Sequence, residues 1–216
     1  MNKDIELVCR SVCEAGLRLS AEGLVARTWG NISIRIDERR MAVTPSGIMY
    51  GDIRPEHIAI MDIFTGKWEC RVKPSGERKL HAEIYKSRPD IGAVVHTHQL
   101  NASVCAAART TVEVMSRKSA GILKTEQVLC GSYGLPGTGK LTRGTVSAIK
   151  DSMCALMANH GAVCLGRDID EAFTVSRVLE KVCGEFIASK INSFEAYGKT
   201  GAEKVCDSYL RLHSHS

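Results

Sequence analysis

Aromatic residues are scarce in this sequence, at 5% of its 216 residues. Proteins that bind single-stranded nucleic acid stack bases on aromatic side chains, so the scarcity argues against such a surface. Basic residues outnumber acidic ones by 29 to 24, and they are scattered in short runs, usually beside Glu. We therefore expect no nucleic-acid partner, whereas a mildly positive surface suits a small anionic substrate.

Long apolar runs and paired cysteines are also missing. No apolar stretch reaches the length of a membrane-spanning helix, and "MNKDIELVCR" at the start contains acidic residues and no apolar signal core. The nine cysteines are an odd number, spread from Cys9 to Cys206 without a C-x-x-C pair, unlike the dense, even sets of secreted disulfide frameworks. These features predict a soluble cytoplasmic protein with reduced thiols and no membrane partner.

The hydrophobic residues predict helices and strands that alternate irregularly. We find no internal repeat, low-complexity tract or Pro/Ser linker, so we interpret residues 1–216 as one domain. Helical spacing predicts helices at 4–20, 76–87, 101–108 and 169–190. Apolar runs predict strands at 31–37, 41–44, 58–63, 67–70 and 91–98, and on both sides of a turn at 159–161. We expect an α/β fold in three layers, a central, mostly antiparallel sheet flanked by helices.

Two histidines close together in a predicted strand are the first candidate site. In "HTH", His96 and His98 are two residues apart, so in a strand their side chains point to the same face. Two imidazoles on a rigid strand end form half of a zinc or similar transition-metal site. Polar residues on the open face of a sheet would give the same pattern.

Further candidate ligands lie in two other segments. His160 sits in a tight Asn-His-Gly turn between two apolar strands, a bend that can aim a side chain into a cleft. Glu77 begins the helix before the "HTH" strand, and His81, one turn further on the same helix face, is a rival ligand. Three His and one Glu would complete a tetrahedral shell. A carboxylate that can leave such a shell opens a site and becomes a base.

Each of three short loops pairs a glycine with a residue whose side chain can donate a hydrogen bond. Glycine lets a phosphate approach main-chain N–H groups, and Ser or Asn adds a donor of its own. The loops are Gly30–Asn31, Ser46–Gly47 and Ser75–Gly76. The third begins a helix that Ser75 is expected to cap, where the N–H groups and the dipole favour an anion. Trp29 is expected to pack beneath the first loop.

The segment "GLPGTGKLT" at 134–142 nearly matches the nucleotide phosphate loop, G-x-x-x-x-G-K-[ST]. Leu141 occupies the position where a Ser or Thr hydroxyl should bind magnesium. The chain also has no apolar strand that ends in the Asp such a site needs. We interpret the segment as a turn that starts a helix at Leu141.

Five motifs together resemble the class II aldolase and epimerase family: "TWGNIS", "VTPSGI", "KPSGE", "AVVHTH" and "NHGAVCLG". They occur in the family's order and approximate spacing, and the resemblance runs from about residue 5 to residue 190. Residues 191–216 are a variable C-terminal tail. The resemblance implies a mostly antiparallel sheet between helical layers and a homotetramer with active sites at subunit borders.

Carried over to this chain, the resemblance implies a role for each candidate residue. His96, His98 and His160 would bind Zn²⁺, with Mn²⁺ or Co²⁺ as substitutes. Glu77 would be the fourth ligand and the proton carrier, and because the epimerase branch has Asp there, it favours the aldolase branch. The residues of the three loops would hold the substrate phosphate: Gly30, Asn31, Ser46, Gly47, Ser75 and Gly76.

This chain departs from the family's pattern at two places. The family's aldolases have Ser-Ser where this chain has Ser75–Gly76, so one hydroxyl is lost. The tyrosine that protonates the aldehyde oxygen would fall near Ser116, in a segment without Tyr. A second family tyrosine corresponds to Tyr209, which is our catalytic candidate in the tail.

The predicted function is a zinc-dependent aldolase that makes or cleaves a ketose 1-phosphate resembling L-fuculose 1-phosphate. The products would be dihydroxyacetone phosphate and an aldehyde. Alternatives with the same fold are a dehydratase or a decarboxylase of a sugar phosphate, and a non-catalytic adducin-like scaffold domain. A scaffold has no reason to keep the four candidate ligands.

Overall fold

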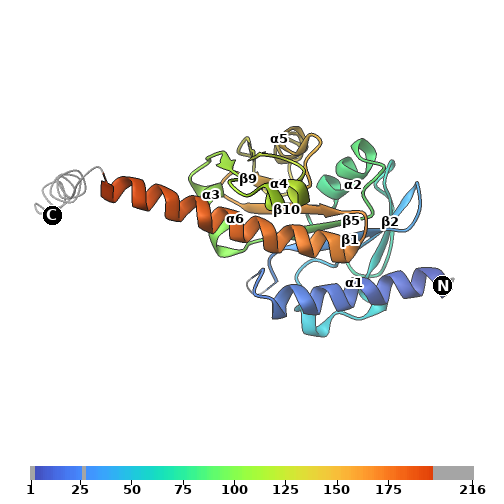
Figure 1. The fold of residues 1–216 in the computed structure, drawn as a ribbon. Coiled ribbons are helices and arrows are strands. Elements are labelled where there is room, and N and C mark those ends of the chain that lie inside the picture. The colour runs from blue at the N-terminus through green and yellow to red at the C-terminus, as the bar shows by residue number, and fades with distance from the viewer. Residues whose placement is uncertain (1–2, 26–27, 197–216) are drawn as a thin grey trace, which may run out of the picture.

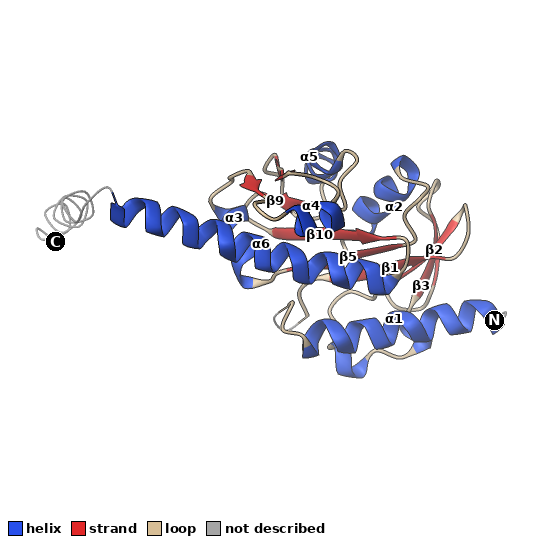
Figure 2. Cartoon of the chain, viewed as in Figure 1, coloured by secondary structure: helices blue, strands red, loops and turns tan. Residues whose placement is uncertain are grey.

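The computed structural model describes residues 3–25 and 28–196 and contains a large sheet with helices on both of its faces (Figures 1 and 2). The eight-stranded sheet has the order β4-β3-β2-β1-β5-β10-β9-β8, and only the β8–β9 pair is parallel. Its strands are β1 (Asn31–Arg35), β2 (Arg40–Val43), β3 (Ala59–Asp62), β4 (Trp68–Glu69), β5 (Ala93–Thr97), β8 (Cys130–Gly131), β9 (Cys154–Met157) and β10 (Gly161–Gly166). The predicted fold class is confirmed.

The remaining elements are a small second sheet and the helices. β6 (Val112–Glu113) pairs with β7 (Gln127–Val128). The helices are α1 (Lys3–Ala21), α2 (Arg78–Ser87), α3 (Leu100–Ala107), α4 (Arg117–Leu123), α5 (Gly139–Ile149) and α6 (Ile169–Ala196). None of the helices in the described ranges combines the length and the apolar character that a bilayer span requires.

Strand β1 divides its side chains between the two faces of the sheet. Ile32 packs into the hydrophobic cluster that contains α1, whereas Asn31 and Ser33 point to the opposite face and form hydrogen bonds with α2 and its N-cap residue. Figure 1 shows α1 on one side of the sheet and α2 and α5 on the other. Because β1 pairs with β5 so that Asn31 lies opposite His96, polar side chains from two neighbouring strands meet on the α2 face.

Three helix ends differ from the sequence expectation. Glu77, and not Ser75, is the N-cap of α2, although the Ser75 hydroxyl accepts a hydrogen bond from the Glu77 N–H at 3.2 Å. Helix α5 begins at Gly139, two residues before Leu141, because the Thr138 side chain caps it. Helix α6 continues to Ala196, six residues beyond the predicted end.

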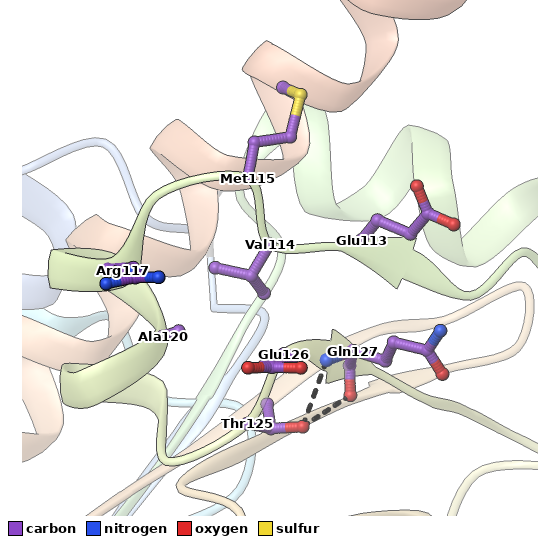
Figure 3. Close-up of a pocket in the computed structure, with 8 residues that line it drawn as sticks. All are labelled: Glu113, Val114, Met115, Arg117, Ala120, Thr125, Glu126 and Gln127. Atoms are coloured by element: carbon purple, nitrogen blue, oxygen red, sulfur yellow. Dashed lines mark hydrogen bonds between the residues drawn. The ribbon is translucent and has the colours of Figure 1, made fainter.

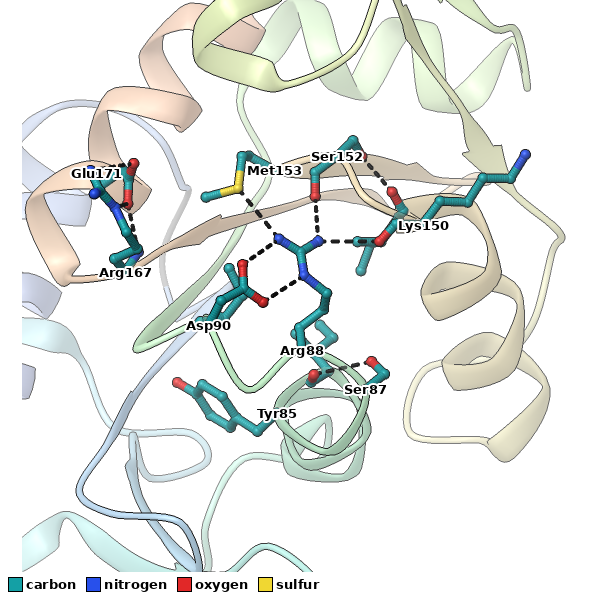
Figure 4. Close-up of polar contacts among 12 residues, drawn as sticks. Tyr85, Ser87, Arg88, Asp90, Lys150, Ser152, Met153, Arg167 and Glu171 are labelled. Atoms are coloured by element: carbon teal, nitrogen blue, oxygen red, sulfur yellow. Dashed lines mark hydrogen bonds and ion pairs between the residues drawn. The ribbon is translucent and has the colours of Figure 1, made fainter.

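Arg88 anchors the C-terminal end of α2 to the loop between α5 and β9 (Figure 4). Its guanidinium binds both carboxylate oxygens of Asp90 at 2.8 Å and donates to the carbonyl oxygens of Lys150 at 3.1 Å and Ser152 at 3.0 Å. The side chain is 14% exposed, so little water can replace these bonds. The group fixes the distance between α2 and the loop that precedes β9.

We expect Arg88→Ala to lower the free energy of unfolding by about 2 kcal/mol, because it removes several charge-assisted hydrogen bonds made by a side chain that is largely shielded from water. Urea denaturation followed by circular dichroism would measure the change. Arg167→Ala is the matched control, since Arg167 pairs with Glu171 on the surface and should matter much less. Equal losses in both variants would contradict the anchoring role.

Candidate active site

Three imidazole rings converge at the end of β5. His96 lies on β5, His98 follows that strand, and His160 occupies the turn between β9 and β10. The Nε2 atom of His96 is 2.9 Å from Nε2 of His98 and 3.0 Å from Nε2 of His160. The structure thus brings together the three histidines that the sequence singled out, as a group able to hold a metal ion.

The protonation of these rings favours a cation between them. The Nδ1 atom of His96 must donate to the carbonyl oxygen of Ala162, 2.8 Å away, so its Nε2 carries a lone pair when the ring is neutral. Burial lowers the pKa of His96, with Glu77 opposing, and burial together with the neighbouring rings lowers the pKa of His98 to about 3. The lone pair of His96 Nε2 therefore points into the space between the three rings, where it would attract a positive ion.

The donor set fits a divalent transition metal. Two ligands of a tetrahedral ion with bonds of 2.0–2.1 Å are roughly 3.3 Å apart, close to the observed separations. His96, His98 and His160 would hold such an ion, and imidazole nitrogen suits Zn²⁺ and its neighbours in the first transition row.

Glu77 is the acidic member of the group. One carboxylate oxygen lies 3.2 Å from His96 Nε2 and the other 3.0 Å from His160 Nε2. Asn31 Nδ2 donates to the first oxygen at 2.9 Å. The residue is 8% exposed, and although burial raises its pKa, the attraction of His96 and His160 and the bond from Asn31 outweigh burial and hold the pKa well below its usual range. The carboxylate is therefore ionised at neutral pH, as a ligand or a base requires.

A cavity of about 470 Å³ opens beside the four residues. Its lining includes all six residues predicted to bind phosphate: Gly30, Asn31, Ser46, Gly47, Ser75 and Gly76. Pro45 and Pro74 form an isolated β-bridge, which brings the second and third loops side by side. The sequence-predicted loops and the candidate metal site therefore share one cavity.

Gly30 allows its loop to lie directly on β5. Its φ is +83°, in the left-handed region that favours glycine, and a Cβ there would lie 2.7 Å from the carbonyl oxygen of His96. A side chain at this position would push the loop away from the histidines.

The expectation for Trp29 is wrong. Its side chain is 56% exposed and lines the cavity, and its ring centroid lies 5.7 Å from that of His98. The apolar residue before a glycine suggested packing, but the turn at Gly30 directs the indole outward.

His81 does not join the three histidines. Its side chain is completely buried, and its Nδ1 lies 2.7 Å from the Ser33 hydroxyl, beneath the site. The alternative that His81 is a ligand is therefore disfavoured, although it shares a helix face with Glu77.

The cavity residues that the sequence reasoning missed include Pro136 and Asn159. Pro136 lines the cavity. It belongs to the "GLPGTGKLT" segment, which the sequence analysis interpreted only as a turn. Asn159 lines the cavity with a φ of 58°, and its side chain accepts a bond from Arg109 Nε at 2.6 Å. The Asn-His-Gly turn was the available signal for Asn159, since Asn tolerates the left-handed conformation.

Ser116, near which the resemblance places the acid that protonates the aldehyde oxygen, does not line the cavity. Ser116 caps α4 through a bond from the Ser119 N–H, and a separate pocket of about 670 Å³ lies beside this segment (Figure 3). Its lining contains no tyrosine: Glu113, Val114, Met115, Arg117, Ala120, Thr125, Glu126 and Gln127. Tyr209 lies outside the described residues, and its role stays a prediction.

Comparison with known families gives one match over most of the chain. The family described as Class II Aldolase and Adducin N-terminal domain matches residues 10–187. This chain belongs to that family. The resemblance inferred from the five motifs is confirmed, and the chain is a class II aldolase.

Individual relatives agree with this assignment. The 5-methylthioribulose-1-phosphate/5-deoxyribulose-1-phosphate aldolase of Rhodospirillum rubrum is 31% identical over 173 residues, which cover 80% of this chain and 77% of that protein. The L-fuculose phosphate aldolase of Haemophilus influenzae is 28% identical over 178 residues, covering 82% and 81%. A solved L-fuculose 1-phosphate aldolase superposes with a TM-score of 0.80 at 29% identity, covering 85% and 86%.

Proposed function

We propose that the protein is a zinc-dependent, cytoplasmic lyase that cleaves a ketose 1-phosphate to dihydroxyacetone phosphate and an aldehyde. The observation that carries the proposal is the position of the ionised Glu77 against three converging histidines, in a cavity lined by three phosphate-type loops. Such a cavity offers a place for an anionic group and a base within reach of the same ion. A homotetramer with its sites at subunit borders is the proposed assembly.

The residues divide the work of the reaction. Backbone N–H groups and the Ser46 and Ser75 hydroxyls bind and orient the phosphate, which holds the scissile bond near Glu77. A divalent ion bound by the histidines would act as a Lewis acid on the substrate's carbonyl oxygen. When the C–C bond breaks, a hydroxyl loses a proton and the freed carbon gains one, so no other co-reactant is needed. Glu77, which is ionised at rest, has to take up a proton in the course of the cleavage before it can deliver one to the carbon.

Apolar side chains in the lining of the cavity favour an apolar aldehyde. Trp29 and Pro136 present apolar surface to the cavity, and the Asn159 amide oxygen already accepts a bond from Arg109. A tail with several hydroxyls would find few partners, because polar groups need hydrogen bonds when water is excluded. A 5-deoxy or 5-methylthio pentulose 1-phosphate is therefore the proposed substrate class, in line with the name of the R. rubrum relative.

A panel of ketoses tests both parts of this proposal. We expect 5-deoxyribulose 1-phosphate and 5-methylthioribulose 1-phosphate to be cleaved with a kcat/KM about tenfold above that of L-fuculose 1-phosphate, as one apolar contact would give. Removal of the phosphate should lower kcat/KM by at least about a hundredfold, since several charge-assisted hydrogen bonds are lost. Reduction of released dihydroxyacetone phosphate by a coupled dehydrogenase would measure the rates.

Two results would contradict the proposal. Equal kcat/KM with and without the phosphate would mean that the three loops are only turns. Consumption of the ketose phosphate without release of dihydroxyacetone phosphate would point to the dehydratase or decarboxylase instead.

A further inference from the structure

The three loops that are proposed to bind the substrate phosphate contain no cationic side chain. Among the described residues, the cavity lining includes neither Lys nor Arg, and the ionised Glu77 adds a negative charge. A phosphate ester carries a charge of about −1.5 to −2 at neutral pH. A positive charge close behind the loops would offset this imbalance.

Arg78 lies directly behind the third loop, in the first turn of α2. One guanidinium nitrogen donates to the Ser75 carbonyl oxygen at 3.0 Å, and the Arg78 backbone N–H donates to the same oxygen at 3.3 Å. The guanidinium carbon lies over the Trp68 ring, 4.7 Å from its centroid, and this contact restricts where the charge can move. The charge of Arg78 is therefore held against the backbone of a residue that lines the cavity.

Helix stability does not account for a cation at this position. The N-terminus of a helix is the positive end of its dipole, so a positive side chain in the first turn is unfavourable. The first turn of α2 contains no acidic residue, and within the described ranges the side chain of Arg78 contacts Ser75 and Trp68 without a carboxylate. Glu77 precedes Arg78, but adjacent helical residues do not face each other, and its carboxylate lies against the histidines. An anion that is not part of the chain would balance the charge.

The bond from Arg78 also sets the direction of an unused donor. The peptide bonds described are all trans, and a planar trans peptide directs the Ser75 carbonyl and the Gly76 N–H to opposite sides. Because Arg78 binds the carbonyl, the Gly76 N–H points away from the guanidinium. This N–H has no hydrogen-bond partner in the described part of the chain, and Gly76 lines the cavity. It is therefore available to an anion.

We propose that Arg78 supplies the positive charge of the phosphate site from behind the Ser75–Gly76 loop, as a positioning residue that does not touch the substrate. It offsets the partial negative charge of the Ser75 carbonyl, keeps the Gly76 N–H directed away from itself and attracts a dianion through space. The inference rests on the proposed function for the identity of the anion as a substrate phosphate. The contact with the loop and the uncompensated charge are properties of the chain itself.

Three variants separate the charge of Arg78 from its hydrogen bond and from the net charge of the surface. Arg78→Lys keeps the charge, whereas Arg78→Gln removes the charge and keeps a shorter side chain with an N–H donor. Lys79→Gln is the matched control, since it removes a charge from the next residue of the same turn. Lys79 lines the groove between α2 and α5 and does not line the phosphate cavity.

We expect Arg78→Gln to bind inorganic phosphate and dihydroxyacetone phosphate about tenfold more weakly at low ionic strength, as loss of one nearby charge would give. Isothermal titration calorimetry would measure both affinities. The difference should shrink in high salt, which screens charges near the surface but does not repair a misfolded loop. Arg78→Lys and Lys79→Gln should remain within about threefold of the wild type.

Steady-state kinetics add a readout that a merely structural role would not give. In Arg78→Gln, KM for the ketose 1-phosphate should rise about tenfold with little change in kcat, because a remote binding contribution is lost. The value of kcat/KM for the non-phosphorylated ketose should not change. An equal loss for both ketoses would overturn the proposal, because the substitution would then disturb the whole site.

The binding data can also overturn the proposal. Wild-type affinity for phosphate in Arg78→Gln would do so, as would an equal loss in Arg78→Lys or in Lys79→Gln. Failure of the aldolase proposal is distinguishable: the wild type would bind phosphate in an Arg78-dependent way without releasing dihydroxyacetone phosphate from any ketose. A wild type that binds no phosphate would overturn both proposals.

Discussion

Glu77→Gln should retain bound metal and slow proton exchange at dihydroxyacetone phosphate by about two to four orders of magnitude, the usual contribution of a positioned base. The amide is nearly isosteric with the carboxylate and can coordinate weakly through its oxygen, but it cannot accept a proton at neutral pH. The low pKa of Glu77, caused by His96, His160 and Asn31 against the effect of burial, keeps the wild-type base ionised. Hence the difference between variant and wild type should persist across neutral pH.

Exchange of the carbon-bound proton with deuterated water, followed by NMR without any aldehyde, isolates this step. The unassigned acid at the aldehyde end cannot affect the result, because no aldehyde is present. Glu83→Gln is the matched control: Glu83 lies on the same helix, pairs with Lys86 at the surface and should leave exchange unchanged. A wild type that holds zinc and binds dihydroxyacetone phosphate without exchanging the proton would exclude the aldolase reaction and favour the dehydratase or decarboxylase.

Local periodicity was sufficient to predict most elements of the fold. The alternation in 31–37 and the i, i+2 spacing of His96 and His98 depend only on strand geometry, so β1, β5 and their faces followed from the residues themselves. The short elements β6, β7, β8 and α4 were not predicted. The pairing of β1 with β5, which places Asn31 opposite His96, joins segments 65 residues apart in the sequence. No local pattern encodes that register, so the bond from Asn31 to Glu77 could not be predicted.

The expectations for Ser75 and Trp29 failed for the same reason, which is contact between segments far apart in the sequence. Ser75 has the residue type of a helix cap, yet the pairing of Pro45 with Pro74 holds its backbone in the neighbouring loop and shifts the cap to Glu77. Trp29 has the character of a core residue, but the positive φ of Gly30 turns the chain so that the indole reaches the cavity. In both cases, contacts with distant segments determined the outcome over local propensity.

The metal site supports the prediction with the largest expected effect. Replacing His96 and His98 together by Ala should abolish stoichiometric metal binding and reduce lyase activity to background. Two of the three converging nitrogens disappear, and Glu77 with His160 alone cannot hold a transition metal against a chelator. Metal content by mass spectrometry after dialysis, with activity on the same samples, would measure the effect.

The two single variants should differ in stability, because His96 and His98 are buried to different degrees. His98 is partly exposed, so His98→Ala should leave the circular dichroism spectrum and the fold intact while metal is lost. His96 is almost completely buried and donates to Ala162, so His96→Ala should also lower the free energy of unfolding. His57→Ala is the matched control, because His57 lies in a short 3-10 helix and does not belong to the convergent group. Full metal occupancy in the double variant would disprove the three-histidine site, because the ion would then have to be bound by other residues.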